Sequence, residues 1–204
     1  MRRVAALIFD GFELLDLYGP LQMLGVCEDR FSLTLVAERP DPVASAQGVR
    51  ACPDATMDAG TGYDLLLVPG GMGTRRAVGN PAVLDWLRAV AAEPRAEMVL
   101  SVCTGSLLLA GAGLLDGRRA TTNKAAFAGI AARYPKVDWV RQARWVEDGR
   151  FITASGVSAG MDMTLRAIAL MLGEDTADEV AVICEYQRQR DSARDPFAQV
   201  HGLL

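Results

Sequence analysis

Short apolar runs alternate with longer amphipathic stretches along most of the chain. The apolar runs predict strands over residues 3–9, 31–37, 64–68, 97–102 and 118–121, with a further antiparallel pair over 144–146 and 151–154. The amphipathic stretches predict helices over residues 16–27, 81–93, 104–113, 124–133, 158–172 and 175–187. Between the second and third strands, Gln47-Gly48 predicts a hairpin within residues 43–53. This alternation indicates βαβ units and therefore an α/β fold with a mostly parallel central sheet.

The length of the chain and its apolar content predict one domain. With 204 residues, half of them hydrophobic, the chain can bury one substantial core. We expect a single α/β domain over residues 1–187. Residues 188–204 are charged and contain Pro196, so we expect them to form a C-terminal surface extension or a contact with a partner.

Composition and charge exclude several classes of function. The 21 basic and 25 acidic residues are spread along the chain and give a net charge of −4, so nucleic acid is not an expected partner. No apolar run approaches the roughly 18 to 20 residues that a membrane helix needs. The four cysteines stand at 27, 52, 103 and 184, without zinc-site spacing or neighbouring histidines. We therefore expect a cytoplasmic protein with reduced thiols, no metal site and no cofactor.

The segment Val99-Leu100-Ser101-Val102-Cys103-Thr104-Gly105-Ser106 carries the main chemical prediction. A buried strand runs directly into a helix, so Cys103 lies on a sharp turn at the carboxyl end of the sheet. The positive end of the following helix favours thiolate and predicts a lowered cysteine pKa. The alternative is that Cys103 is a small core residue, as many free cysteines are. The chain has one histidine, His201, close to its end, which disfavours a cysteine–histidine mechanism.

Two further segments are candidates for the same site. Gly70 and Gly71 end the preceding strand, and we expect the Gly71 amide to stabilise an anion together with the Thr104 amide. Asp16 follows the first strand among apolar neighbours, so burial could raise its pKa and let it pass a proton to or from the thiol. A helix N-cap is the alternative explanation for Asp16.

Several motifs together resemble the ThiJ/PfpI superfamily over nearly the whole chain. They are Leu15-Asp16-Leu17-Tyr18-Gly19-Pro20, Val68-Pro69-Gly70-Gly71, Ser101-Val102-Cys103-Thr104-Gly105-Ser106, Ala120-Thr121-Thr122 and Ser158-Ala159-Gly160-Met161-Asp162. The first and third are similar to the isonitrile hydratase branch and to the sensor-like domain of AraC-type regulators.

The resemblance implies a fold, a reaction and an assembly. The fold would be a flavodoxin-like three-layer sandwich with a cysteine nucleophile elbow. Cys103 would match the nucleophile that attacks an isocyanide carbon, and Asp16 the acidic partner that protonates it. Thr104 and Gly71 would flank the bound substrate, and a homodimer is implied as well.

One departure from the family pattern keeps other functions open. Relatives commonly have Thr-Thr-His-Trp where this chain has Thr121-Thr122-Asn123-Lys124. Asn123 can bind a substrate through hydrogen bonds but cannot shuttle a proton, and we expect Lys124 to bring a charge near the pocket rim. A thiol or redox sensor, a non-catalytic ligand-binding protein and a glyoxalase or deglycase are the alternatives. No helix-turn-helix domain follows the fold in this chain, so we do not expect a direct transcription factor.

Overall fold

Seven strands form the central sheet of the computed structural model, which describes residues 1–204, in the order β10-β11-β7-β6-β1-β2-β5. All neighbours are parallel except β10 and β11, which pair antiparallel. The strands are β1 (Arg2–Leu7), β2 (Phe31–Ala37), β5 (Ala55–Thr56), β6 (Leu65–Val68), β7 (Met98–Val102), β10 (Trp145–Asp148) and β11 (Phe151–Ala154). The mostly parallel sheet predicted from the sequence is confirmed.

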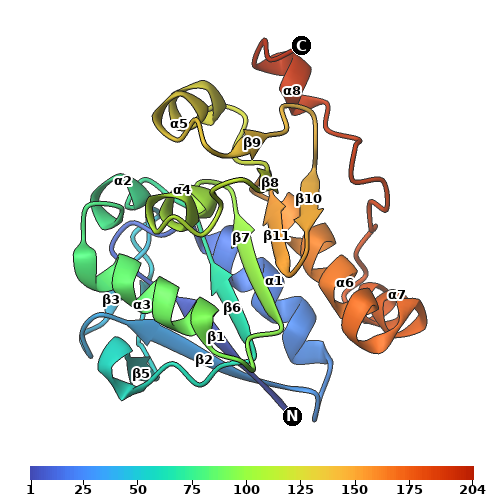
Figure 1. Ribbon diagram of the computed structural model, residues 1–204. Coiled ribbons are helices and arrows are strands. Elements are labelled where there is room, and N and C mark those ends of the chain that lie inside the picture. The colour runs from blue at the N-terminus through green and yellow to red at the C-terminus, as the bar shows by residue number, and fades with distance from the viewer.

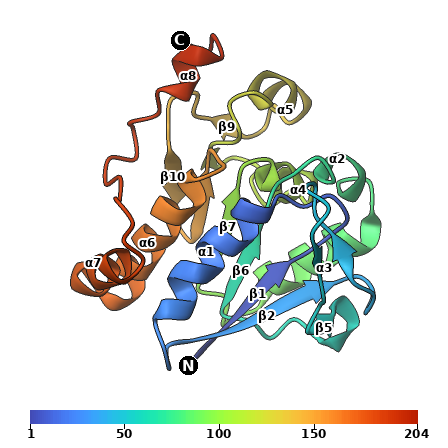
Figure 2. The same cartoon turned by 180° about the vertical axis from the view of Figure 1, so that it is seen from behind.

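Helices cover both faces of this sheet and complete a three-layer sandwich. On one face lie α1 (Leu14–Val26), α6 (Ala159–Leu172) and α7 (Glu174–Ile183), which pack against one another. On the other face lie α2 (Thr74–Ala77), α3 (Pro81–Ala92) and α4 (Gly105–Gly111). Figure 1 places α3 and α4 in front of the sheet, and Figure 2 shows α1 and α6 in front when the molecule is turned round.

The remaining elements are short. β3 (Val43–Ala44) and β4 (Arg50–Ala51) form the hairpin that Gln47-Gly48 predicts. The strand expected at residues 118–121 is β8 (Arg119–Ala120), which lies outside the main sheet and pairs with β9 (Asp138–Trp139). The other short elements are η1 (Met57–Ala59), α5 (Phe127–Arg133) and α8 (Phe197–Val200).

The core is made of aliphatic side chains from the central strands. Leu65, Leu66, Leu67 and Val68 are all at most 1% exposed, as is typical of a parallel strand covered on both faces. Glycines allow the helices to approach closely. A Cβ on Gly19 of α1 would lie 2.9 Å from the Cγ of Met161, and one on Gly160 would lie 2.8 Å from Val102. The two glycine-containing motifs of α1 and α6 therefore have a packing role.

The C-terminal segment is anchored to the rest of the fold. The Lys124 Nζ lies 3.4 Å from an oxygen of Asp195, and these side chains are 2% and 0% exposed. The carbonyl of Ser192 accepts a hydrogen bond of 2.7 Å from the Arg144 amide. The segment runs along the outside of the domain from α7 to α8 (Figure 1). The expectation that Lys124 lies at a pocket rim is therefore wrong, because its charge is buried against this segment.

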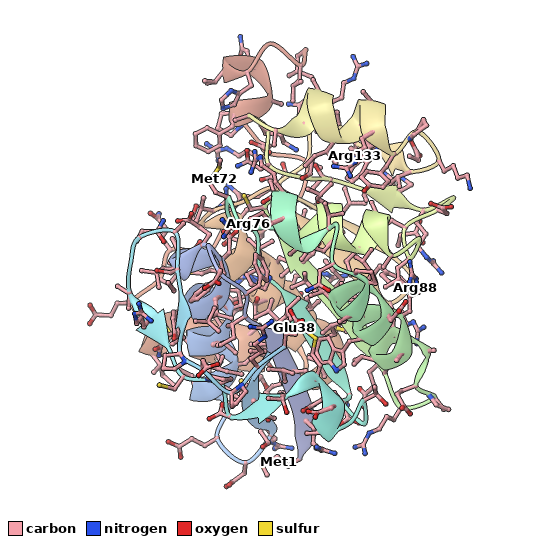
Figure 3. All side chains as sticks on the ribbon, turned by 90° about the vertical axis from the view of Figure 1, so that its left-hand side faces the viewer. Met1, Glu38, Met72, Arg76, Arg88 and Arg133 are labelled. Atoms are coloured by element: carbon pink, nitrogen blue, oxygen red, sulfur yellow. The ribbon has the colours of Figure 1, made fainter.

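The two ends of the sheet differ in their surroundings. Met72 and Arg76, on the segment that follows β6, lie toward one end of the molecule, below the helix that carries Arg133, and Met1 lies at the opposite end (Figure 3). The turns at the carboxyl ends of β1, β6 and β7 gather at the first of these ends, where open α/β sheets place their ligands. None of the helices has both the length and the apolar character needed to cross a bilayer.

Candidate active site

Cys103 occupies the strand-to-helix turn between β7 and α4, as the sequence predicts. Its φ of 56° is a left-handed conformation, which costs a non-glycine residue energy and has to be held by its neighbours. The Cys103 carbonyl accepts hydrogen bonds from Ser106 Oγ at 3.2 Å and Thr122 Oγ1 at 3.1 Å. Its amide donates to the Ala154 carbonyl at 3.0 Å. These contacts, from α4, from β11 and from the loop after β8, fix the elbow.

Gly156 covers the cysteine from the loop that follows β11. A Cβ at this position would lie 2.6 Å from the Cβ of Cys103 and 3.2 Å from its Sγ, and the φ of Gly156 is 103°. Only glycine fits such an approach. Gly156 is not among the residues predicted for the site, although a glycine so close after a predicted strand is a signal for it. The cover leaves Cys103 only 7% exposed.

Asp16 lies in the first turn of α1 and is completely buried. Its Oδ2 accepts a hydrogen bond of 2.9 Å from the Gly70 amide, while Oδ1 has no hydrogen-bond partner. The helix begins after Glu13, so Asp16 is not its N-cap. Burial, opposed by the Gly70 hydrogen bond and reinforced by the nearby Glu13, raises the pKa of Asp16 to about 7. The predicted rise of this pKa is confirmed.

The thiol of Cys103 and the carboxyl of Asp16 lie close enough for each to shift the pKa of the other. This interaction lowers the pKa of the carboxyl and raises that of the thiol, because the carboxylate attracts the thiol proton and repels a thiolate. Burial is the largest cause of the raised pKa of Cys103, and the Asp16 charge is the second. The Thr104 amide and hydroxyl act in the opposite direction, but more weakly. The sequence-based expectation of a lowered cysteine pKa is therefore wrong, since desolvation and the Asp16 charge outweigh the hydrogen bonds from Thr104.

The backbone amides of Thr104, Gly71 and Gly70, which the sequence places at the site, face different partners in the structure. The Thr104 amide faces the sulfur closely enough to stabilise a thiolate. The Gly71 amide instead donates to Thr104 Oγ1 at 3.1 Å, and Thr74 Oγ1 contacts the same hydroxyl at 3.1 Å. The Gly70 amide donates its hydrogen bond to the carboxylate of Asp16 and not to the sulfur of Cys103. The substrate-binding roles of Gly71, Thr104 and Gly70 stay predictions.

Asn123 lies close in sequence to Thr122, which holds the Cys103 carbonyl, but its own side chain has a local partner. Its Oδ1 accepts a hydrogen bond of 3.2 Å from the Ala126 amide and so forms the turn that precedes α5. Its role in substrate binding stays a prediction. His201 is exposed on the C-terminal segment.

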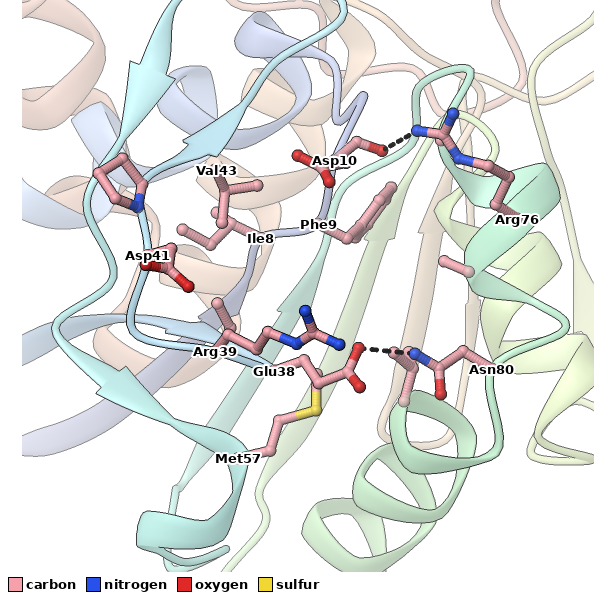
Figure 4. A pocket seen from close by; sticks show the side chains of 15 residues that line it. Ile8, Phe9, Asp10, Glu38, Arg39, Asp41, Val43, Met57, Arg76 and Asn80 are labelled. Carbon is pink, nitrogen blue, oxygen red and sulfur yellow. Dashed lines mark hydrogen bonds between the residues drawn. The ribbon is translucent and has the colours of Figure 1, made fainter.

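A pocket of about 420 Å³ lies beside this site, between the carboxyl ends of β1 and β2 and the helices α2 and α3 (Figure 4). It does not include Cys103 or Asp16 among its lining residues. Part of its polar lining is already paired, since Glu38 accepts from Asn80 Nδ2 at 2.7 Å and the Asp10 carbonyl from Arg76 at 3.3 Å. Figure 4 shows both hydrogen bonds. The structure brings together no group of three or more histidine, cysteine, aspartate or glutamate side chains that could hold a metal ion.

A comparison with known protein families covers most of the chain. The profile of the DJ-1/PfpI family matches residues 2–170. The chain belongs to this family. The match extends from β1 into α6 and therefore includes Asp16, Gly70 and Cys103.

Two curated relatives have different functions. Isonitrile hydratase from Pseudomonas putida is 36% identical over 186 residues, which cover 90% of this chain and 78% of the hydratase. An HTH-type transcriptional regulator from Pseudomonas aeruginosa is 30% identical, and the match covers 97% of this chain but only 60% of the regulator. Members of the family thus include an enzyme and a regulator.

A solved structure confirms the fold. The crystal structure of a ThiJ/PfpI family protein from Pseudomonas syringae superimposes with a TM-score of 0.84 and 29% sequence identity. The match covers 98% of this chain and 84% of that protein. The family resemblance and the three-layer α/β fold predicted from the sequence are both confirmed.

Proposed function

We propose that the protein is a cysteine-dependent lyase for small molecules, and that it hydrates isocyanides to N-substituted formamides. The observation that carries this proposal is the electrostatic coupling of the Cys103 thiol to a buried Asp16 whose pKa is raised to about 7. A group with a pKa near neutrality can both accept and donate a proton. The 36% identity to the isonitrile hydratase from Pseudomonas putida supports the choice of substrate class.

The reaction begins with a proton transfer between the two side chains. The Asp16 carboxylate takes the thiol proton while the sulfur of Cys103 forms a bond to the terminal carbon of the isocyanide. That carbon carries a lone pair, and the Asp16 carboxylic acid protonates it. The product is a thioimidate, R–N=CH–S, on Cys103, and the carboxylate is regenerated.

Water completes the reaction. It adds across the C=N bond, with its hydroxyl on carbon and its proton on nitrogen. When the tetrahedral adduct collapses, the C–S bond breaks and the hydroxyl proton goes to the sulfur by way of Asp16. The amide R–NH–CHO leaves and the Cys103 thiol is restored, so that one isocyanide and one water give one formamide.

The burial of the site favours a slender electrophile. Cys103 is 7% exposed, and Gly156 lies against its Cβ, so little room surrounds the sulfur. A terminal isocyanide presents a single carbon at the end of a linear group and can approach end-on. A dicarbonyl such as methylglyoxal is broader next to its reactive carbon, which makes it a poorer fit.

Formamide production from an aryl isocyanide tests the proposal. We expect turnover by the wild-type protein and by a Cys52→Ala control, which removes an exposed thiol. We expect no turnover by Cys103→Ala or Asp16→Asn. The value of kcat/KM should rise with pH up to about 7, as Asp16 gains its negative charge. Equal activity of the Cys103→Ala and wild-type proteins would end the proposal.

A non-catalytic thiol sensor is the second candidate. The 30% identity to a transcriptional regulator over 97% of this chain favours it, as does the asparagine at position 123. An inert wild-type protein in which mild peroxide converts Cys103 alone to a sulfinic acid would support this function. Conversion of methylglyoxal to lactate would instead support a glyoxalase.

We also propose that two copies of the chain form a homodimer through α1 and the end of α7. Leu15 and Tyr18 on α1 are each 41% exposed, and Ile183 on α7 is 67% exposed. Tyr18 and Ile183 line the same surface groove, so these two apolar side chains belong to one face of the molecule. Light scattering on the purified protein measures the mass, and Tyr18→Lys should shift it from that of a dimer to that of a monomer.

A further inference from the structure

A second cavity, of about 620 Å³, lies between the C-terminal segment and the residue that precedes β10. Four arginines line it: Arg144, Arg188, Arg190 and Arg194. Its other lining residues are two glutamines, a proline and Phe197, and no aspartate or glutamate takes part. We call this cavity the arginine pocket. Its volume is within the range of small-molecule sites.

Carboxylates hold these arginines from outside the pocket. Arg144 Nε donates to Asp162 on α6 at 2.6 Å. Arg188 Nη1 donates to Glu174 at 2.9 Å and to Asp178 at 3.2 Å, both on α7. Because none of these acids lines the pocket, they orient the guanidinium groups without occupying the space between them. This arrangement preorganises positive charge around a cavity.

Two arginines of the pocket have guanidinium N–H groups without a protein acceptor: Arg188, whose side chain is mostly buried, and Arg194, which is exposed. The Arg188 side chain is only 7% exposed, and its Nε is buried without a hydrogen-bond partner. The Arg194 guanidinium makes neither a hydrogen bond nor an ion pair with any side chain. A buried donor on a charged group that remains unsatisfied costs more free energy than a neutral one. Because Arg188 lines a cavity without carboxylates, a negatively charged ligand there would supply the acceptor that its side chain lacks.

We propose that the arginine pocket binds a small oxyanion, namely a phosphate or carboxylate group carried by a metabolite. Planar guanidinium groups pair with both through two parallel hydrogen bonds, so the four arginines suit either chemistry. Phe197, which is 48% exposed, offers an apolar surface to the rest of the ligand. The site is separate from the Cys103 reaction and does not depend on it.

Calorimetric titration of the full chain tests the site, with inorganic phosphate and with succinate as separate probes. The ionic strength is kept at about 0.15 M, so that general screening stays constant. We expect saturable binding of at least one probe, with one ion per chain. The tighter probe identifies the preferred oxyanion. Cys103→Ala should bind with unchanged affinity, which separates this result from that of the lyase proposal.

Matched variants locate the binding. Arg194→Gln removes the unpaired guanidinium, breaks no ion pair and should weaken binding about tenfold. Arg141→Gln removes the same charge from an exposed position outside the pocket and should leave the affinity unchanged. The proposal is overturned if neither probe shows saturable binding at concentrations on the order of 10 mM. Equal weakening by the two substitutions would also overturn it, because it would indicate screening rather than a site.

Discussion

Asp16→Asn should stabilise the protein at pH 8 while abolishing its activity. The pKa of Asp16 is raised from 3.8 to about 7, mainly by burial, so the folded chain holds a proton that the unfolded chain releases. Between these pH values the unfolded state binds fewer protons, and the free energy of unfolding of the wild type falls as pH rises. The stability associated with the protonated carboxyl is complete below pH 3.8 and is lost by about pH 7.

The size of the effect follows from the shift itself. A rise from 3.8 to about 7 corresponds to a loss of about 4 kcal/mol at pH 8. The Asp16→Asn variant has no ionisable group at this position, so its free energy of unfolding does not fall with pH in this way. The side-chain oxygen of the asparagine can still accept the hydrogen bond from the Gly70 amide. We therefore expect the free energy of unfolding of the variant to exceed that of the wild type increasingly from pH 4 to pH 7, and then by a constant amount.

Urea denaturation of both proteins at pH 4, 5, 6, 7 and 8 measures this difference. Asp41→Asn serves as a control, because it removes an exposed carboxylate that takes part in no ion pair. The difference between this control and the wild type should be nearly independent of pH. A difference for Asp16→Asn that is flat or falls with pH would refute the reasoning that Asp16 is a buried proton reservoir.

Three further substitutions test how the elbow and the C-terminal segment are held. Gly156→Ala should cost about 1 to 3 kcal/mol more than Gly149→Ala in urea denaturation, because both glycines have a positive φ but only the first would clash with the cysteine. Thr122→Val removes a buried hydrogen bond to the elbow carbonyl and should cost about 1 kcal/mol and lower formamide turnover. Asp195→Asn leaves the buried Lys124 charge unpaired, should cost about 3 to 5 kcal/mol and should expose the C-terminal segment to limited proteolysis. An unchanged proteolysis pattern would contradict the anchoring role of that ion pair.

The sequence predicts the central elements well because their apolar patterns are strong. The strand predicted at 31–37 has those bounds in the structure, and the helix predicted at Pro81 begins there. By contrast, β5, β9 and α8 have between two and four residues each and were missed, since such short elements carry no periodicity of their own. Their positions depend on tertiary contacts, such as the pairing of β8 with β9 outside the main sheet.

In the candidate site, too, the features with a local sequence pattern could be predicted and those set by tertiary packing could not. The elbow at Cys103 could be predicted because a buried strand meets a helix without a loop between them. The raised pKa of Cys103 could not be predicted. Burial of the thiol, to which Gly156 contributes, and repulsion of a thiolate by Asp16 both depend on packing between segments far apart in sequence. The burial of Lys124 was missed for a related reason, since its partner Asp195 lies in a segment predicted to be a surface extension.

Intact-protein mass spectrometry after rapid acid quenching tests the central claim most directly. During turnover of an aryl isocyanide, the account predicts a wild-type species heavier by the mass of one isocyanide, with the addition located on the peptide that contains Cys103. Cys103→Ala should show no addition. A wild-type protein that produces formamide without any such species, or that carries it on another cysteine, would contradict the thioimidate mechanism.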